Sequence, residues 1–177
     1  ARMVPGLVPS RECLLVTAED LKRVLANFAT GVTVVTTLED DGTAHGMTAN
    51  AFSSVSLQPP LVLLCVDHKA NTHTLIRKQG RFGINILSQG QQKLAEYFAM
   101  KQKCAQDAPG SCTLTSSGIP RLEGCLAFLG CQVVGSHEYG DHTIFVARVE
   151  EADVNSGQPL LYFRRGYRHM DLDGDRS

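Results

Sequence analysis

The stretch GVTVVTTLEDDGTAHGMTAN, residues 31–50, decides the fold class. Val and Thr dominate its first half and recur in the second, and β-branched residues favour extended strands. Asp41-Gly42, between the two halves, is a dipeptide typical of tight hairpin turns. The stretch therefore predicts two antiparallel strands, about 32–39 and 43–50.

Strand patterns continue along the rest of the chain. The apolar run LVLLCV, residues 61–66, follows two prolines and predicts a buried strand. Gly140-Asp141 is a second turn signal, between two long stretches with strand composition. The strands predicted beyond the first hairpin are 61–67, 81–87, 122–139, 142–154 and 160–163.

A helix is predicted before the first hairpin. Residues 17–20, TAED, have the form of a capping box, the side-chain pattern that begins many helices. We expect this helix to end at Ala29-Thr30-Gly31. Its apolar residues follow at helical spacing and would share one face: Leu21, Val24, Leu25 and Phe28.

Two more short helices are predicted between strands. The first covers about 71–78, with Asn71 or Thr72 as its N-cap. The second covers 88–100 and carries Leu94, Tyr97 and Phe98 on one face. Helices inserted between hairpins, without regular βαβ alternation, indicate a mostly antiparallel β fold with short helices, closed as a barrel.

The length of 177 residues fits one domain with a substantial core. We expect an irregular N-terminal arm at 1–16, the domain at 17–170 and a frayed acidic tail at 171–177. A long polar loop is predicted at 101–118.

Charge and cysteine content narrow the class of partner. The 17 Lys and Arg against 18 Asp and Glu give a net charge of -1, so no basic excess favours nucleic acid. The longest apolar run is six residues, too short for a membrane span, and we see no secretory signal. The six cysteines form no CxxC pair, and several lie in strand-like segments. We therefore expect a soluble protein of the reducing cytoplasm.

Common catalytic motifs are absent from the sequence. There is no GxGxxG, no phosphate-binding GxxxxGK[ST] and no GxSxG. His137 and His142 stand in HEYGDH, which does not match HExxH, and we predict no metal site. Residues 46–60 are dense in Thr, Asn and Ser and suit a polar ligand such as a phosphate or a flavin edge. The alternative is a turn-rich loop that satisfies its own backbone.

Four segments, taken together, resemble the short-chain flavin reductase family. They are FATGVTVVTT (28–37), GMTANAFSSVSLQPPLVLLCV (46–66), RFGINIL (81–87) and GDHTIFVARVE (140–150). The resemblance implies an FMN-binding split β-barrel that works as a homodimer. It also implies an NAD(P)H:flavin oxidoreductase, NADH being preferred, that passes a hydride to FMN or FAD. Such proteins supply reduced flavin to a partner flavin-dependent monooxygenase.

The resemblance also implies which residues hold the two cofactors. His142 would lie beside the nicotinamide as the catalytic residue, with Gly140, Asp141, Tyr167 and Arg168 completing that site. The residues implied for the flavin are Thr30, Gly31, Val32, Thr33, Thr48, Ala49, Asn50, Ser53, Ser54, Val55, Lys69, Asn71, Thr72, Arg81 and Phe82. Among them, Lys69, Asn71 and Thr72 would hold the phosphate.

Several of these assignments have structural alternatives. Thr33 fits a strand on propensity alone, and Asn71 fits a helix cap. His142 could be a turn residue bonded to Asp141. The basic cluster Arg164, Arg165 and Arg168 could grip a pyrophosphate or be a solvated face.

Other functions remain open on the sequence. One is a non-catalytic flavin-binding electron carrier, and another is a split-barrel reductase with a corrin or ferric acceptor. A pyridoxamine-phosphate oxidase is disfavoured because no second basic cluster is dedicated to a phosphate. The motifs do not separate FMN from FAD, nor a prosthetic flavin from an exchangeable one.

Overall fold

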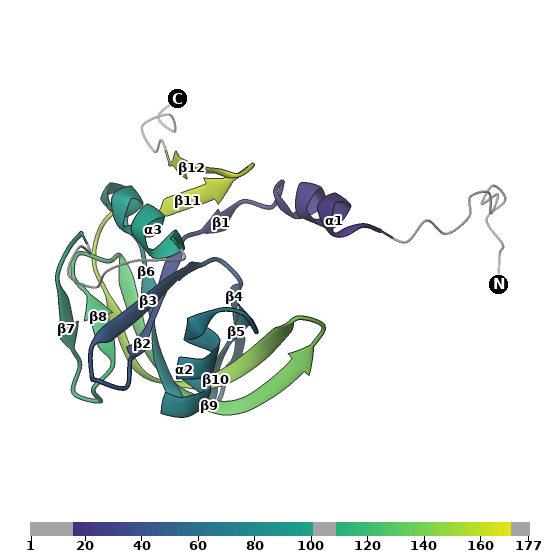
Figure 1. Ribbon diagram of the computed structural model, residues 1–177. Coiled ribbons are helices and arrows are strands. Elements are labelled where there is room, and N and C mark those ends of the chain that lie inside the picture. Colours follow the sequence, from purple (N-terminus) through teal and green to yellow (C-terminus); the bar gives the residue numbers. More distant parts are fainter. Residues whose placement is uncertain (1–15, 101–108, 171–177) are drawn as a thin grey trace, which may run out of the picture.

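The structure is a computed structural model, which describes residues 16–100 and 109–170 (Figure 1). The predicted arm, except for Val16, and the predicted tail lie outside the described residues. Most described residues belong to antiparallel strands, so the predicted fold class is confirmed.

A seven-stranded antiparallel sheet forms the body of the molecule, in the order β3-β2-β6-β9-β10-β5-β4. β3 and β4 are the two edges of this sheet, yet only Asn50 and Ala51 connect them. Two residues span only about 10 Å, so the sheet must curl until its edges meet. No ladder joins β3 to β4 among the described strands, so the barrel is split there. The seven strands are β2 (Thr33–Leu38), β3 (Ala44–Ala49), β4 (Phe52–Leu57), β5 (Pro60–Asp67), β6 (Arg81–Ile86), β9 (Ala127–Tyr139) and β10 (His142–Val154).

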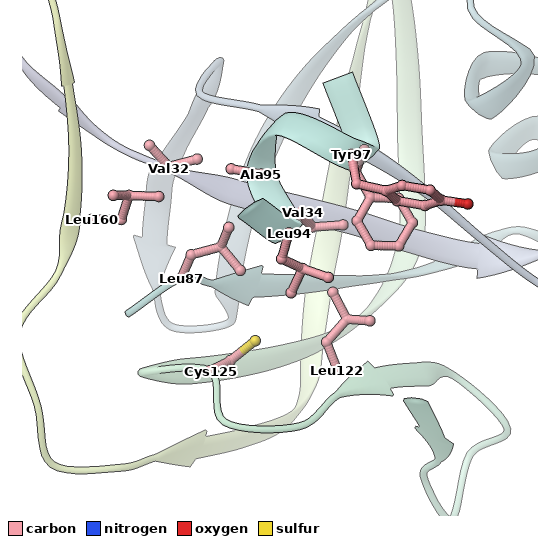
Figure 2. Close-up of a cluster of buried hydrophobic side chains, with 10 residues drawn as sticks. Val32, Val34, Leu87, Leu94, Ala95, Tyr97, Leu122, Cys125 and Leu160 are labelled. Atoms are coloured by element: carbon pink, nitrogen blue, oxygen red, sulfur yellow. The ribbon is translucent and has the colours of Figure 1, made fainter. Parts of the chain in front are cut away.

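Neighbouring residues of β2 serve two different cores because side chains alternate along a strand. Val35 lies in the barrel interior with Leu64, Phe82 and Phe145. Val34 lies in the outer core, which Figure 2 shows between the sheet and the helix that carries Tyr97. The described members of this outer core are Val32, Val34, Leu87, Leu94, Ala95, Tyr97, Phe98, Leu122, Cys125 and Leu160.

The remaining elements cover the barrel. β1 (Thr30–Gly31), β11 (Leu160–Phe163) and β12 (Gly166–His169) form a small sheet, and β7 (Cys112–Leu114) pairs with β8 (Pro120–Leu122). Helix α2 (Asn71–Gln79) contributes Ile76 to the barrel interior. The short helix η1 (Gln89–Gln91) leads into α3 (Gln92–Ala99), which packs on β3.

The close packing of α3 on β3 depends on Gly46. A Cβ placed on Gly46 would lie 2.5 Å from Cε1 of Phe98, which is too close for any side chain. The absence of a side chain therefore lets β3 approach the helix. The predicted apolar face of α3, formed by Leu94, Tyr97 and Phe98, is buried as expected.

Helix α1 (Ala18–Leu25) begins at the predicted capping box of Thr17 and Asp20. The expected end at Ala29-Thr30-Gly31 is wrong, because Thr30 and Gly31 form β1 and pair with β11. In Figure 1 the helix projects from the body, and none of its residues is buried. The predicted apolar face is therefore exposed: Leu21, Val24, Leu25 and Phe28.

Four other expectations need correction. The predicted strand 122–139 is interrupted, because β8 ends at Leu122 and β9 begins at Ala127. The N-cap of α2 is Ala70, not Asn71 or Thr72, and no side chain caps this helix. Residues 52–57 form strand β4, although their Ser-rich sequence had suggested a loop. The predicted loop 101–118 contains strand β7 in its described part, which starts at residue 109.

Candidate functional site

A groove follows one side of β3. It consists of two adjoining pockets of about 350 and 380 Å³, and both contact Met47 and Ala99. We call the pocket beside α2 the anion end and the pocket beside β11 and β12 the aromatic end. Sites for small ligands and cofactors have this range of size.

Four of the predicted flavin residues line the aromatic end, and so does one predicted nicotinamide residue. Val32 lies at its inner side, and Thr48, Ala49 and Asn50 follow one another along β3 into its connection to β4. The full lining of this pocket is Val32, Met47, Thr48, Ala49, Asn50, Ala99, Tyr162 and Tyr167. The sequence prediction missed Met47, Ala99 and Tyr162, because apolar and aromatic residues in core-like segments carry no separate signal.

Hydrogen bonds fix β3 at the aromatic end. Thr48 Oγ1 donates to Ala95 O at 2.7 Å and so ties β3 to α3. Thr33 is buried, and its Oγ1 donates to Ala49 O at 2.6 Å. Thr33 therefore supports the wall of the pocket from behind. It is also an ordinary residue of strand β2, as the structural alternative expected.

The main chain of β3 provides polar groups of its own. β3 is an edge strand, so alternate peptide groups point away from β2, its only partner among the described strands. The peptide groups near Thr48 and Asn50 that point away from β2 suit a flat heterocycle with carbonyl and imide edges. Asn50 adds an amide whose Nδ2 donates to Thr30 Oγ1 at 3.2 Å.

Two tyrosines form the outer wall of the aromatic end. The rings of Tyr162 and Tyr167 meet edge to face with centroids 5.5 Å apart. They face each other because β11 and β12 form a hairpin in which these two residues are paired. Burial, then Glu96 and Tyr162, raises the pKa of Tyr167, so its hydroxyl remains a hydrogen-bond donor.

The anion end is built around the start of α2. Lys69, Asn71 and Thr72, predicted to hold a phosphate, all line this pocket. The first backbone N–H groups of a helix have no partner within it and attract anions. Asp67 Oδ1 accepts from the backbone N–H of Lys69 at 2.8 Å and holds the turn before the helix.

His45 of β3 also lines the anion end, and the sequence prediction missed it. Its Nδ1 lies 2.7 Å from Glu39 Oε1, and its Nε2 lies 2.9 Å from Thr72 Oγ1. The signal available was weak: a single histidine after a hairpin turn. Only the fold shows that β3 passes beside α2.

Of the predicted nicotinamide residues, Tyr167 alone is among the residues that line the groove. Gly140 and Asp141 form the turn between β9 and β10, and His142 is paired with Asp67 next to the anion end. Asp141 Oδ1 lies 2.7 Å from His142 Nδ1, and this contact lowers the pKa of Asp141. Tyr167 instead lies at the aromatic end.

Several predicted residues line neither end of the groove. Ser53, Ser54 and Val55 are exposed on the edge strand β4. Thr30 is connected to the aromatic end by its hydrogen bond with Asn50, and Gly31 is not among the residues that line it.

Two other predicted residues belong to β6, and their side chains lie on opposite sides of this strand. Phe82 is fully buried in the barrel core, because it alternates with Arg81 along the strand. Arg81 donates to Gln132 Oε1 at 2.7 Å and lines a separate pocket with Gln79 and Ser117.

The basic cluster has a structural role. Arg164 and Arg165 occupy the turn between β11 and β12 with φ of 49° and 62°, a conformation unusual for side-chain-bearing residues. Arg164 Nε donates to Asn27 Oδ1 at 3.0 Å, and Arg165 Nη2 donates to Glu19 Oε1 at 2.7 Å. The turn thus holds the tyrosine hairpin against α1 and the residues after it.

No group of three or more His, Cys, Asp or Glu residues that could hold a metal occurs within 16–100 and 109–170. Over the same ranges, no helix is long and apolar enough to cross a membrane.

Comparison with known proteins identifies the family of this chain. Residues 25–171 match the family model for the flavin reductase like domain. An NADH-dependent flavin reductase of a Rhodococcus species is 44% identical over 161 residues, covering 90% of each chain. The reductase component of a 4-nitrophenol 4-monooxygenase/4-nitrocatechol 2-monooxygenase from Rhodococcus opacus is 40% identical, covering 85% of this chain and 80% of that protein.

A solved structure is similar over the same region. It is an NADH:FAD oxidoreductase of Streptomyces globisporus in complex with NAD and FAD fragments. The TM-score is 0.82 at 37% identity, covering 89% of this chain and 94% of that chain. The family model covers most of this chain, and the resemblance drawn from the sequence motifs is confirmed: this protein belongs to the flavin reductase like family.

Proposed function

We propose that this protein is an NADH-dependent flavin reductase that supplies reduced FMN or FAD to a flavin-dependent monooxygenase. The observation that carries the proposal is the groove along β3, whose two adjoining pockets offer Lys69 and the start of α2 at one end and two tyrosines at the other. A flavin nucleotide has the same polarity, with a phosphate at one end of a chain and a flat ring at the other. The family membership and the named activities of the relatives support the same function.

The residues of the groove fit a flavin nucleotide. Lys69, Asn71 and the first N–H groups of α2 would hold the phosphate. Outward peptide groups of β3 from Thr48 to Asn50 would contact the polar edge of the ring, with Val32 and Met47 against its faces. Bound flavin supplies the hydride acceptor, so the protein needs no nucleophile of its own.

The second cofactor, NADH, would meet the flavin at the aromatic end. Tyr162 and Tyr167 would pack against stacked rings and exclude water from them. Arg168, whose Nη1 donates to Tyr167 O at 2.7 Å, would hold a phosphate of the dinucleotide. Gly140, Asp141 and His142 remain proposed contacts; their turn lies beside the anion end.

We propose a homodimer as the working form. Four apolar residues of α1 and the segment after it are each more than half exposed: Leu21, Val24, Leu25 and Phe28. An exposed apolar face of this kind marks an interaction surface. A pocket between α1 and β11 shares Asn50 and Tyr162 with the aromatic end, so a second copy covering α1 would also close the groove.

The compartment and the partner are also proposals. The described cysteines, Cys65, Cys112, Cys125 and Cys131, are free thiols, which supports the reducing cytoplasm. The name of a relative as a monooxygenase reductase component supports a monooxygenase partner. Flavin held in an open groove can leave, which suits an exchangeable carrier of electrons.

The direct test is NADH oxidation by the purified protein with and without added flavin. We expect oxidation that requires FMN or FAD and saturates with it, and slower oxidation of NADPH. Flavin binding without oxidation of either dinucleotide would contradict the proposal and indicate a non-catalytic carrier.

A further inference from the structure

His45 connects the outer surface to the anion end of the groove. The imidazole lies between Glu39, directly after β2, and Thr72, in the first turn of α2. Its side chain is 13% exposed, whereas that of Glu39 is 41% exposed. Glu39, His45 and Thr72 thus form a hydrogen-bonded chain whose inner members line the pocket.

The chemistry of the three groups fixes where the protons lie. The Glu39 carboxylate can only accept, so His45 Nδ1 carries a proton in either charge state of the ring. In the neutral ring Nε2 has no proton and accepts a hydrogen bond from the Thr72 hydroxyl. In the imidazolium Nε2 donates to Thr72 Oγ1, and the hydroxyl proton becomes available for another acceptor.

The position of Thr72 allows its hydroxyl to donate a hydrogen bond to an anion in the pocket. Thr72 follows Asn71 at the start of α2, and both residues line the pocket beside Lys69. A phosphate in this pocket would accept from the helix N–H groups and from Lys69. The protonated ring of His45 adds a positive charge near the phosphate and frees the Thr72 hydroxyl to donate.

We infer that His45 is a proton-linked positioning residue, which strengthens the binding of the flavin phosphate when its ring is protonated and weakens it when the ring is neutral. This inference rests on the proposed function, because it assigns the anion end to the phosphate of a flavin nucleotide. Phosphate binding and His45 protonation then favour each other, as two linked binding events must.

The charged surroundings allow this linkage. Among the described residues near His45, Glu39 favours the imidazolium from the end of β2. Asp67 and Lys69, from the connection between β5 and α2, line the same pocket with opposite charges. Tyr97 of α3 lines the pocket on the other side of His45. An unperturbed histidine changes charge between about pH 5 and pH 8, so the linkage is tested at two pH values within this range.

The test compares FAD with riboflavin by titration calorimetry at about pH 6 and about pH 8. FAD is preferred to FMN because the FMN monoester itself gains a proton at about pH 6. Riboflavin has the ring and no phosphate. We expect FAD to bind roughly tenfold more tightly at the lower pH, the effect of one hydrogen bond to a charged group. Riboflavin affinity should be the same at both pH values.

Two variants assign the effect to His45. His45→Gln should remove the pH dependence of FAD binding. His137→Gln should retain it, because His137 is exposed on β9 and lines neither end of the groove. Glu39→Gln keeps an acceptor for Nδ1 of His45 and loses the negative charge. It should therefore move the midpoint of the pH dependence of FAD binding roughly half a pH unit lower. If His45→Gln does not fold, the shift in Glu39→Gln still tests whether His45 causes the pH dependence.

Each outcome decides the inference. Equal FAD affinity at both pH values, pH dependence that persists in His45→Gln, or the same dependence with riboflavin would overturn it. Those results would leave the proposed function intact, because FAD would still bind. Absence of binding by either flavin would instead overturn the proposed function and this inference together.

Discussion

The two ends of the groove are held in place in different ways. At the anion end, His45 and Thr72 are hydrogen-bonded to each other. His45 belongs to strand β3 of the barrel, and Thr72 belongs to helix α2, which packs against the barrel interior through Ile76. At the aromatic end, Tyr162 and Tyr167 lie on a hairpin that exposed arginines hold to α1. The barrel itself therefore fixes the anion end, whereas the aromatic end depends on an outer hairpin and on its contacts with α1 and the residues after it.

The packing of α3 on β3 is the first place to disturb this arrangement, because both ends contact Met47 of β3 and Ala99 of α3. Gly46→Ala should lower the free energy of unfolding by about 1–3 kcal/mol, because its Cβ would overlap Phe98 and push α3 from β3. Urea denaturation measures this change. Gly31→Ala is the matched control, since nothing lies within 4 Å of its Cβ, and it should change stability far less.

The anion end should decide affinity for the nucleotide. Lys69→Met should weaken FMN binding about tenfold and leave riboflavin binding unchanged, because only FMN offers a phosphate. Fluorescence titration with both flavins measures the difference. Lys78→Met is the control, since Lys78 lies at the other end of α2 in an ion pair with Asp40. An equal loss of riboflavin binding would place the phosphate elsewhere.

The aromatic end should decide the reaction with NADH. Tyr167→Ala should lower kcat/KM for NADH by up to about tenfold, the size of one aromatic contact, with little change in FMN affinity. Tyr139→Ala, at an exposed position on β9, should have no effect. If Tyr167→Ala instead weakened FMN and left NADH kinetics unchanged, the roles of the two ends would be exchanged.

A substitution in the turn Gly140 to His142 tests whether NADH extends from the aromatic end to this turn beside the anion end. His142→Ala should raise KM for NADH a few-fold and leave stability unchanged, because the half-exposed His142 side chain is hydrogen-bonded to the exposed Asp141. Steady-state kinetics with varied NADH measure this. An unchanged KM would remove the turn from the nicotinamide site.

The smallest effect expected is a pH dependence of stability near the anion end. Burial, then His68 and Arg77, lowers the pKa of His73, whose Nε2 lies 2.8 Å from Thr143 Oγ1. In the unfolded chain His73 takes up a proton at about pH 6.5, whereas in the folded chain it does so only at lower pH. The free energy of unfolding is therefore higher above pH 6.5 and falls as the pH is lowered. His73→Asn should show a smaller loss between about pH 7 and about pH 5 in urea denaturation.

Much of the fold could be predicted because its signals are local. The Asp41-Gly42 turn, the apolar run at 61–66 and the capping box at Thr17 each depend on neighbouring residues. Strand β4 was missed because its sequence, FSSVSL, belongs to an edge strand with little burial and hence no apolar alternation. The end of α1 was misplaced because β1 is a two-residue strand, created by pairing with β11 far along the chain.

The site was predicted in part, through resemblance rather than through pattern. Lys69, Asn71 and Thr72 lie together as expected because they are consecutive or nearly so. His45 and Tyr162 were missed because their role depends on which elements the barrel brings side by side. Phe82 lies in the core because strand alternation turns it away from the surface, which a motif shared with relatives does not show.

The central claim is that one groove along β3 holds the flavin, with its phosphate at α2 and its ring between β3 and the tyrosine hairpin. A crystal structure of the protein with FMN tests this most directly. We predict phosphate contacts with Lys69 and Asn71, and ring contacts with the main chain at Thr48 to Asn50. A flavin bound in another pocket, or bound in the reverse direction with its phosphate at Tyr162, would contradict the claim.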